Sequence, residues 1–317
     1  VYVMELWHGP TCAFKDMALQ MLPYLLTASL RKTGEQKTVC ILVATSGDTG
    51  KAALEGFRDV PRTKIAVFYP EEGVSDMQKL QMTTQQGQNV YVGAIRGNFD
   101  DAQSTVKKLF ADLGFRRAAE ERGMRLSSAN SINFGRLAPQ IAYYIYSYGR
   151  LVAAREIEAG QKVNFVVPTG NFGNILAAYY AMRMGLPVNR LICASNKNNV
   201  LTDFLESGVY MADREFYKTT SPSMDILISS NLERLLFEIV GRDSDRVRQY
   251  MGDLNEQGNY RIRQAEKLEL DGLFFGGFAD EYPTASTIKN TFAKEGYLMD
   301  THTAVGRTVY LLSLIHI

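Results

Sequence analysis

The sequence predicts an α/β fold that is built on parallel sheets. Strand patterns alternate with helical patterns along the chain, as they do in βαβ units. Two of the strand patterns are mainly apolar, and the first of them is typical of a strand buried on both faces. Each of these two ends in a glycine-containing loop that leads into a helix. At 317 residues the chain is long enough for about two domains with sizeable cores.

The first element is predicted to be a strand over Val1–Leu6, because these residues are mostly apolar or β-branched. Gly9 and Pro10 break it, and a helical pattern follows over Asp16–Arg31. Lys15 therefore lies at the predicted junction. A lysine there can face a cleft with part of its hydration removed, which lowers its pKa and makes the amine a Schiff-base nucleophile. A single lysine at a helix start is, however, more often a solvated surface residue.

Each apolar strand is followed by a glycine loop and a helix. The first series spans 38–44, 45–50 and a helix from about 51, and the second spans 163–168, 169–174 and 175–184. We expect both loops to point backbone N–H groups outward, because glycines let the backbone approach a ligand and a helix N-terminus attracts anions. Each loop is thus a candidate phosphate or carboxylate site, although the same pattern also serves simply to turn corners in parallel sheets.

The remaining elements complete the alternation. Further strands are predicted over 64–69, 89–95 and 190–194, and further helices over 77–85, 99–113 and 135–148. The tyrosines at 143, 144, 146 and 148 fall at spacings that suit core faces, so we assign them no functional role. The sequence contains no run of 18 apolar residues, so no membrane-spanning helix is predicted.

Several function classes are disfavoured by composition and motif. No G-x-x-x-x-G-K-[ST] run is present and neither loop reads G-x-G-x-x-G, which argues against a nucleoside triphosphatase or a dehydrogenase. With 35 basic and 34 acidic side chains the net charge is +1, so no field favours nucleic acid or a membrane surface. Cys12, Cys40 and Cys193 lack C-x-x-C spacing, which predicts a reducing, cytoplasmic compartment without disulfides or zinc.

Five strings in this chain resemble one enzyme family. HGPTCAFKD, TSGDTGKAA, NSINFGRLAPQ, PTGNFGN and HTAVG stand in the order seen in threonine synthases, which are fold-type II pyridoxal-phosphate enzymes. The strings extend from the first residues to about Gly306, so the resemblance covers nearly the whole chain. It implies two parallel-sheet domains with the cofactor in the cleft between them.

The resemblance also implies which residues hold pyridoxal 5′-phosphate. Lys15 would carry the cofactor as a Schiff base, and Thr303 would offer a hydroxyl to the pyridine nitrogen. Asp48 would lie beside the cofactor's ring oxygen, where an acid must be protonated or find another donor. The loop that wraps the cofactor phosphate would consist of Gly170, Asn171, Phe172, Gly173 and Asn174. We expect His8 to pack beside this site without a catalytic role, and the three histidines are too scattered for a metal cluster.

Substrate contacts follow from the same resemblance. Ser46, Gly47 and Thr49 would contact the substrate's carboxylate or leaving phosphate. The polar segment 127–136 is dense in neutral donors followed by one arginine, a mixture that suits a phosphate monoester. Its candidate residues are Asn130, Ser131, Asn133 and Arg136. The alternative is a polar loop with a helix cap.

The polar stretch divides the chain into two predicted domains. Residues 1–134 would carry the Schiff-base lysine and the substrate loop, and residues 135–317 the cofactor phosphate loop. Residues 311–317 resemble no family segment and are interpreted as a non-native tail. The family has an N-terminal domain before the point where this sequence starts, so we expect the chain to be a fragment.

The function implied by the resemblance is conversion of O-phospho-L-homoserine and water to L-threonine and phosphate. The expected partner is therefore a small-molecule substrate, with no nucleic acid or membrane. One alternative is a related lyase or dehydratase that uses the same cofactor on another hydroxy or phospho amino acid. The other is a non-catalytic protein that binds pyridoxal phosphate or a phosphometabolite.

Overall fold

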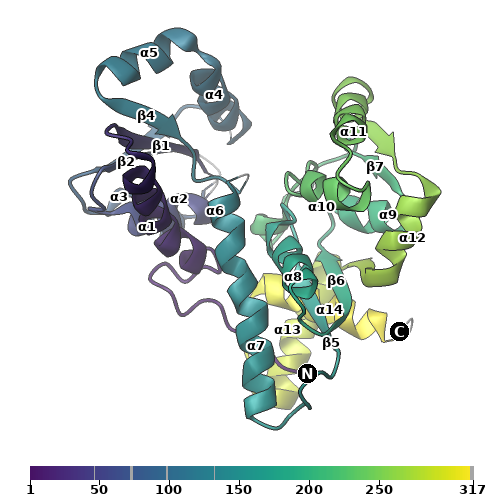
Figure 1. Ribbon diagram of the computed structural model, residues 1–317. Helices are drawn as coiled ribbons and strands as arrows, with labels where there is room; N and C mark the ends of the chain where they lie inside the picture. The colour runs from purple at the N-terminus through teal and green to yellow at the C-terminus, as the bar shows by residue number, and fades with distance from the viewer. Residues whose placement is uncertain (46, 72–73, 98, 132, 315–317) are drawn as a thin grey trace. The chain divides into compact units, whose positions relative to one another are not determined.

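The computed structural model describes residues 1–45, 47–71, 74–97, 99–131 and 133–314. They form two compact units, Val1–Gln140 (unit 1) and Ile141–Ile317 (unit 2), whose helices and strands are labelled in Figure 1. The domain boundary proposed from the sequence, after residue 134, falls at the start of the last helix of unit 1.

Unit 1 contains a four-stranded parallel sheet in the order β3-β2-β1-β4. The strands are β1 (Thr38–Ala44), β2 (Thr63–Pro70), β3 (Val90–Ile95) and β4 (Met124–Ser127). The helices are α1 (Asp16–Thr33), α2 (Asp48–Phe57), α3 (Asp76–Thr83), α4 (Phe99–Ala111), α5 (Leu113–Glu121) and α6 (Phe134–Leu137). The central strand β1 has the bounds that its apolar run predicts.

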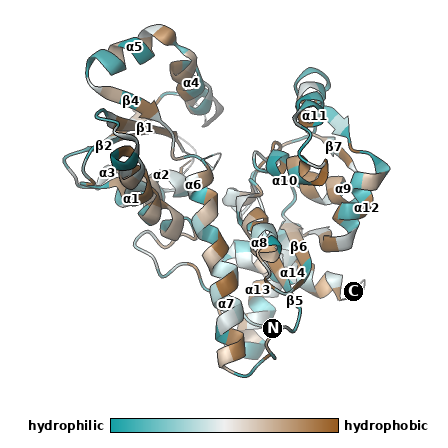
Figure 2. Ribbon diagram, viewed as in Figure 1, coloured by the Kyte–Doolittle hydropathy of each residue, from teal (hydrophilic) through white to brown (hydrophobic). Residues whose placement is uncertain are grey.

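Both faces of this sheet are covered. Val39, Ile41 and Val43 of β1 pack in one core with residues of α1 and α2. Leu42 and Ala44, which alternate with them along the strand, pack in a second core with α4. Since side chains alternate across a strand, β1 has to be apolar on both faces, and Figure 2 shows it as a hydrophobic segment.

Unit 2 contains a three-stranded parallel sheet in the order β5-β6-β9 and a small antiparallel ribbon, β7-β8. The strands are β5 (Val163–Pro168), β6 (Val188–Ser195), β7 (Val209–Met211), β8 (Asn259–Arg261) and β9 (Phe274–Phe278). The helices are α7 (Ile141–Ala153), α8 (Gly173–Arg183), α9 (Val200–Ser207), α10 (Leu232–Ile239), α11 (Ser244–Gln257), α12 (Gln264–Leu273), α13 (Glu281–Glu295) and α14 (Thr301–Ser313). In Figure 2, α11 is largely hydrophilic, as a surface helix should be.

Two adjacent glycines let helices approach both faces of β9. A Cβ on Gly276 would lie 3.1 Å from Cα of Thr202 in α9, and a Cβ on Gly277 would lie 2.7 Å from a methyl of Val309 in α14. Side chains at these positions would push the helices off the sheet. The glycines therefore serve packing rather than ligand binding.

Three predictions about elements are wrong. Val1–Leu6 forms no strand. The helix predicted over 99–113 is two helices, because Asp112 caps α5 by accepting a hydrogen bond from Phe115 N at 2.9 Å. The helix predicted over 135–148 is α6, a 3₁₀ turn over Ala138–Gln140 and then α7, a break that coincides with Pro139 in that turn.

Burial corrects the tyrosine assignment as well. Tyr143 and Tyr144 are buried, but Tyr146 is 65% exposed and does not belong to a core.

Cys12, Cys40 and Cys193 are free thiols. Residues 311–313 complete α14, whereas 315–317 lie outside the described residues. Within the described ranges, no helix combines the length and the hydropathy that crossing a membrane requires.

Candidate functional site

The loop before α1 is folded around one carboxylate. Asp16, the first residue of α1, accepts hydrogen bonds from Thr11 N at 2.9 Å, from Ala13 N at 3.4 Å and from the Thr11 hydroxyl. A Cβ on Gly9 would lie 2.5 Å from the same carboxylate, so only glycine fits there. This arrangement fixes the backbone immediately before Lys15, which occupies the N-cap position of α1.

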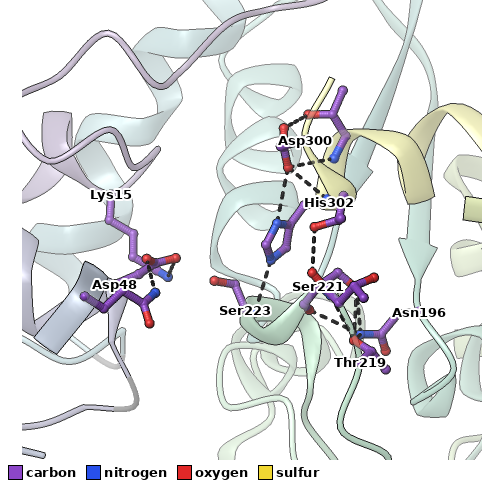
Figure 3. Close-up of polar contacts among 12 residues, drawn as sticks. Lys15, Asp48, Asn196, Thr219, Ser221, Ser223, Asp300 and His302 are labelled. Atoms are coloured by element: carbon purple, nitrogen blue, oxygen red, sulfur yellow. Dashed lines mark hydrogen bonds and ion pairs between the residues drawn. The ribbon is translucent and has the colours of Figure 1, made fainter. Parts of the chain in front are cut away.

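Lys15 is the most perturbed lysine of unit 1. Its side chain is 13% exposed, and its Nζ lies 3.6 Å from Oδ2 of Asp48 (Figure 3). Burial lowers the pKa of Lys15, the attraction of Asp48 works in the opposite direction, and the positive charges of Arg136 and Lys51 lower it further. The net shift is downward. The lowered pKa expected from the sequence is confirmed, although the element before Lys15 is a loop and not a strand.

Asp48 has the donors that an ionised carboxylate needs. Besides Lys15, it contacts Nζ of Lys51 at 3.3 Å and accepts a hydrogen bond from Nε2 of Gln78 at 2.8 Å. Lys51 is one turn further along α2 and is 8% exposed. Lys51 and Gln78 were missed in the sequence. The i, i+3 spacing of Asp48 and Lys51 could have indicated the first, whereas Gln78 is 30 residues away.

The loop before α2 is organised by Thr45. Its hydroxyl oxygen accepts hydrogen bonds from the amides of Gly47 and Gly50, each at 2.9 Å. These two amides therefore do not point outward, and that part of the loop prediction is wrong. Gly47 has φ +147°, and a Cβ on it would lie 2.3 Å from the amide of Gln78.

The other candidates in this loop have different outcomes. The helix begins at Asp48, earlier than expected, which puts the half-buried Thr49 in its first turn. Ser46 lies outside the described residues.

The polar segment 127–136 turns into α6. Asn133 is the N-cap of this helix, because its Oδ1 accepts from Gly135 N at 2.9 Å while its Nδ2 donates to Ser128 O at 2.9 Å. Arg136 is 4% exposed, and its Nη1 donates to Ala129 O at 3.1 Å. Oδ1 of Asn130 is buried and has no hydrogen-bond partner among the described residues. A ligand donor would satisfy it.

In unit 2, hydrogen bonds to the backbone carbonyl groups fix the loop at the start of α8. Ser229 Oγ donates to Gly170 O at 2.8 Å, and Asn231 donates to Asn171 O from its backbone at 3.1 Å and from its side chain at 2.9 Å. Phe172 has φ +61° and a buried ring. The first amides of α8 have no acceptor inside the helix, which makes this loop a candidate anion site.

The neighbours of this loop explain its two glycines differently. A Cβ on Gly170 would lie 2.5 Å from the backbone oxygen of Ser223, whereas a Cβ on Gly173 would meet only Nδ2 of Asn231 at 3.4 Å. The oxygen atoms of Asn174 accept hydrogen bonds from the hydroxyl of Tyr144 at 2.9 and 2.7 Å. Close packing therefore requires glycine at 170 but not at 173.

Thr303 belongs to a second polar group in unit 2. Its hydroxyl donates to Oδ2 of Asp300, the N-cap of α14, at 2.5 Å. Nε2 of His302 accepts from Ser223 N at 3.2 Å, which leaves the ring proton on Nδ1, 3.2 Å from Asp300 Oδ1 (Figure 3). Since the hydroxyl proton of Thr303 is donated to Asp300, its oxygen can act only as an acceptor toward a ligand.

Asp300 is a strong acceptor in this group. Burial works to raise the pKa of its carboxyl, but hydrogen bonds from His302 and Thr303 outweigh burial and hold the pKa well below its usual range. The sequence analysis missed Asp300, Ser229 and Asn231. An aspartate directly before a helical pattern is an N-cap signal that could have indicated the first.

Comparison with known proteins gives the family. The model of the family described as "Pyridoxal-phosphate dependent enzyme" matches residues 1–253. The chain belongs to the pyridoxal-phosphate dependent enzyme family. It is 44% identical to the threonine synthase of Pseudomonas aeruginosa over 305 residues, which are 96% of this chain and 62% of that protein. It is 42% identical to human "Threonine synthase-like 1", covering 97% of this chain and 42% of that protein.

Solved structures agree with the family assignment. The chain is similar to the crystal structure of pyridoxal-phosphate-bound threonine synthase from Brucella melitensis, with a TM-score of 0.89 and 44% identity over 98% of this chain and 64% of that chain. The chain is also similar to the crystal structure of threonine synthase from yeast, with a TM-score of 0.89 and 36% identity over 98% of this chain and 63% of that chain. The predicted fold class, α/β with parallel sheets in a fold-type II enzyme, is thus confirmed. The chain spans less than two thirds of the length of these relatives.

Within each unit, the structure brings some of the predicted residues together. Unit 1 places Lys15 beside Asp48, and in unit 2 residues 170–172 lead directly into α8, which begins at Gly173. The side chain of His8 is 70% exposed, lies 2.8 Å from Glu5 and has its ring centroid 5.6 Å from that of Trp7, and its packing beside the cofactor stays a prediction. The chemistry of both units fits pyridoxal phosphate: unit 1 has an amine of lowered pKa, and unit 2 has a helix N-terminus whose first amides could bind a phosphate.

Proposed function

We propose that this chain is the cofactor-binding part of a threonine synthase, which converts O-phospho-L-homoserine and water to L-threonine and phosphate. The observation that carries the proposal is the buried Lys15 amine, paired with Asp48 and lowered in pKa. Such an amine is the group that pyridoxal-phosphate enzymes need. The 44% identity to a threonine synthase supports the choice of reaction.

The proposal assigns Lys15 of unit 1 and the loop 170–174 of unit 2 to one cofactor. The loop would hold the phosphate dianion by backbone amides and the positive end of α8, and Thr303 would face the ring nitrogen. When bound, pyridoxal phosphate supplies an electron-withdrawing ring that makes the Cα proton of an amino acid acidic. Asp48 would orient the Lys15 amine through their ion pair.

The residues of unit 1 would then act on the substrate. Nζ of Lys15, which is easily deprotonated, moves protons at Cα and Cβ of the substrate. The charges that act on Lys15 are one carboxylate and two cations, Arg136 and Lys51, an environment that favours an anionic ligand group. Arg136, with Asn130, Ser131 and Asn133 on the same segment, would hold the substrate's phosphate, and Thr49 and Ser46 would hold its carboxylate, whereas the amide of Gly47 is already bonded to Thr45.

The reaction is tested by following phosphate release and threonine formation with O-phospho-L-homoserine and the pyridoxal-phosphate-loaded protein. We expect equal amounts of both products, and no phosphate from O-phospho-L-serine. Phosphate from both esters without threonine would identify a different lyase.

A binding protein is the second candidate, because the chain is as similar to "Threonine synthase-like 1", whose name states no reaction, as to the synthases. Cofactor binding without product from either ester would favour it.

The phosphate loop gives a prediction about cofactor affinity. Gly173→Ala adds a methyl group where the protein has room but where it crowds an approaching anion. We expect the affinity for pyridoxal phosphate to fall about tenfold, roughly the loss of one hydrogen bond to a charged group, while the affinity for pyridoxal changes little. Absorbance titrations with the two ligands measure this.

The matched control is Gly149→Ala in α7, where a Cβ meets nothing within 4 Å. It should leave both affinities unchanged. Equal losses for the two ligands in Gly173→Ala would mean that the loop serves packing rather than phosphate binding.

A further inference from the structure

Lys51 is assigned no contact with cofactor or substrate in the function proposed above, yet it is among the most buried cations of unit 1. Its side chain is 9% exposed, on a helix face otherwise formed by small and apolar residues such as Ala52 and Leu54. Burying an ammonium group is costly unless it is paired. Its partner is Asp48, the same carboxylate that contacts Lys15.

The carboxylate is shared unequally. Oδ1 of Asp48 lies 3.3 Å from Nζ of Lys51 and accepts a hydrogen bond from Nε2 of Gln78 at 2.8 Å, whereas Oδ2 lies 3.6 Å from Nζ of Lys15. The contact to Lys15 is thus the longest of the three. A carboxylate with two other donors on it stabilises a neighbouring ammonium less than an unshared one would.

We propose that Lys51 is a positioning residue, which draws Asp48 away from an exclusive ion pair with Lys15 and so keeps the Lys15 amine available as a nucleophile. The inference rests on the proposed role of Lys15. Without Lys51, Asp48 would be free to close on Lys15 and hold it as ammonium, which cannot attack a carbonyl group.

The groups that face Lys15 set the expected signs. They are Asp48 and Lys51 from α2, Arg136 from α6 and the ring of Phe14, whose centroid lies 5.0 Å from the Lys15 nitrogen. Removing the cation Lys51 should raise the pKa of Lys15, and removing the anion Asp48 should lower it. Two neutralising substitutions on one helix therefore act in opposite directions.

The test measures the reactivity of Lys15 in the full chain without cofactor. Trace labelling with acetic anhydride is followed across pH by mass spectrometry of the Lys15 peptide, with the exposed Lys162 as internal reference. At a fixed pH in the rising part of the profile, we expect Lys51→Met to slow labelling about five- to tenfold and to shift the profile to higher pH. Lys51→Arg should restore the original profile, and Asp48→Asn should speed labelling.

Each outcome decides the proposal. An unchanged Lys15 profile in folded Lys51→Met, or a slower reaction in Asp48→Asn, overturns it. If Lys51→Met does not fold, as judged by circular dichroism, Lys51→Gln replaces it, since it also removes the charge, and an unchanged Lys15 profile in that variant overturns the proposal. Because no cofactor is present, the result is separate from the proposed reaction, which fails instead if pyridoxal phosphate does not attach to Lys15.

Discussion

Replacing Lys15 by arginine is expected to reduce turnover of O-phospho-L-homoserine by about a thousandfold or more. Arginine keeps the positive charge beside Asp48, but its guanidinium does not deprotonate in proteins, so it provides neither the nucleophile nor the proton carrier. A positioned acid–base group alone contributes about 10²- to 10⁴-fold. Steady-state phosphate release measures the loss.

The covalent role is checked by reducing the pyridoxal-phosphate-loaded protein with borohydride and mapping the labelled peptide. We expect the label on Lys15 in the original chain and in Lys51→Arg, the charge-conserving control on α2. A label on another lysine would end the assignment, whatever the effect of Lys15→Arg on turnover.

Arg136→Ala is expected to raise the apparent Michaelis constant for O-phospho-L-homoserine about ten- to hundredfold. This corresponds to losing a charge-assisted contact to phosphate, which contributes roughly 1.5 to 3 kcal/mol. The reaction with L-serine, which carries no phosphate, should change little. Parallel kinetics with the two substrates give the comparison.

The burial of Arg136 requires a control for folding. Its side chain is 4% exposed and bonded to the carbonyl of Ala129, so thermal unfolding has to be measured beside the kinetics. Arg136→Lys keeps the charge without the fork and should recover part of the affinity. Equal losses on both substrates would show that Arg136 supports the loop or binds the carboxylate end.

The sequence predicts strands well where burial alone determines them. β1 has the bounds that its apolar run indicates, because a strand covered on both faces needs little other information. β5 also has its predicted bounds, although it is an edge strand in which only Val167 is buried. β9 (Phe274–Phe278) was not predicted, because its two adjacent glycines disfavour a strand in the sequence. They are needed only because helices pack closely on both faces of the strand. Val1–Leu6 has the composition of a strand but no strand beside it.

The candidate site was predictable in its residue types and less so in its contacts. The lowered pKa of Lys15 followed from its place at a helix start, but the charged side chains that act on it come from α2 and α6, further along the chain. The Thr45 hydroxyl accepts hydrogen bonds from two amides of the first loop, a local side-chain contact that the spacing of the glycines does not reveal. The second loop depends likewise on Ser229 and Asn231, about 60 residues away.

The position of Lys15 at the N-cap of an 18-residue helix has a consequence for stability. The N-terminus of a helix carries about half a positive charge, so an ammonium group there opposes the macrodipole and costs about 0.3 to 1 kcal/mol. Lys51 and Arg136 add to the same repulsion. A neutral side chain at position 15 would make unit 1 more stable in the absence of ligands. The reactive amine is therefore kept at the cost of some folding free energy. Binding of an anion near these cations would offset part of that cost.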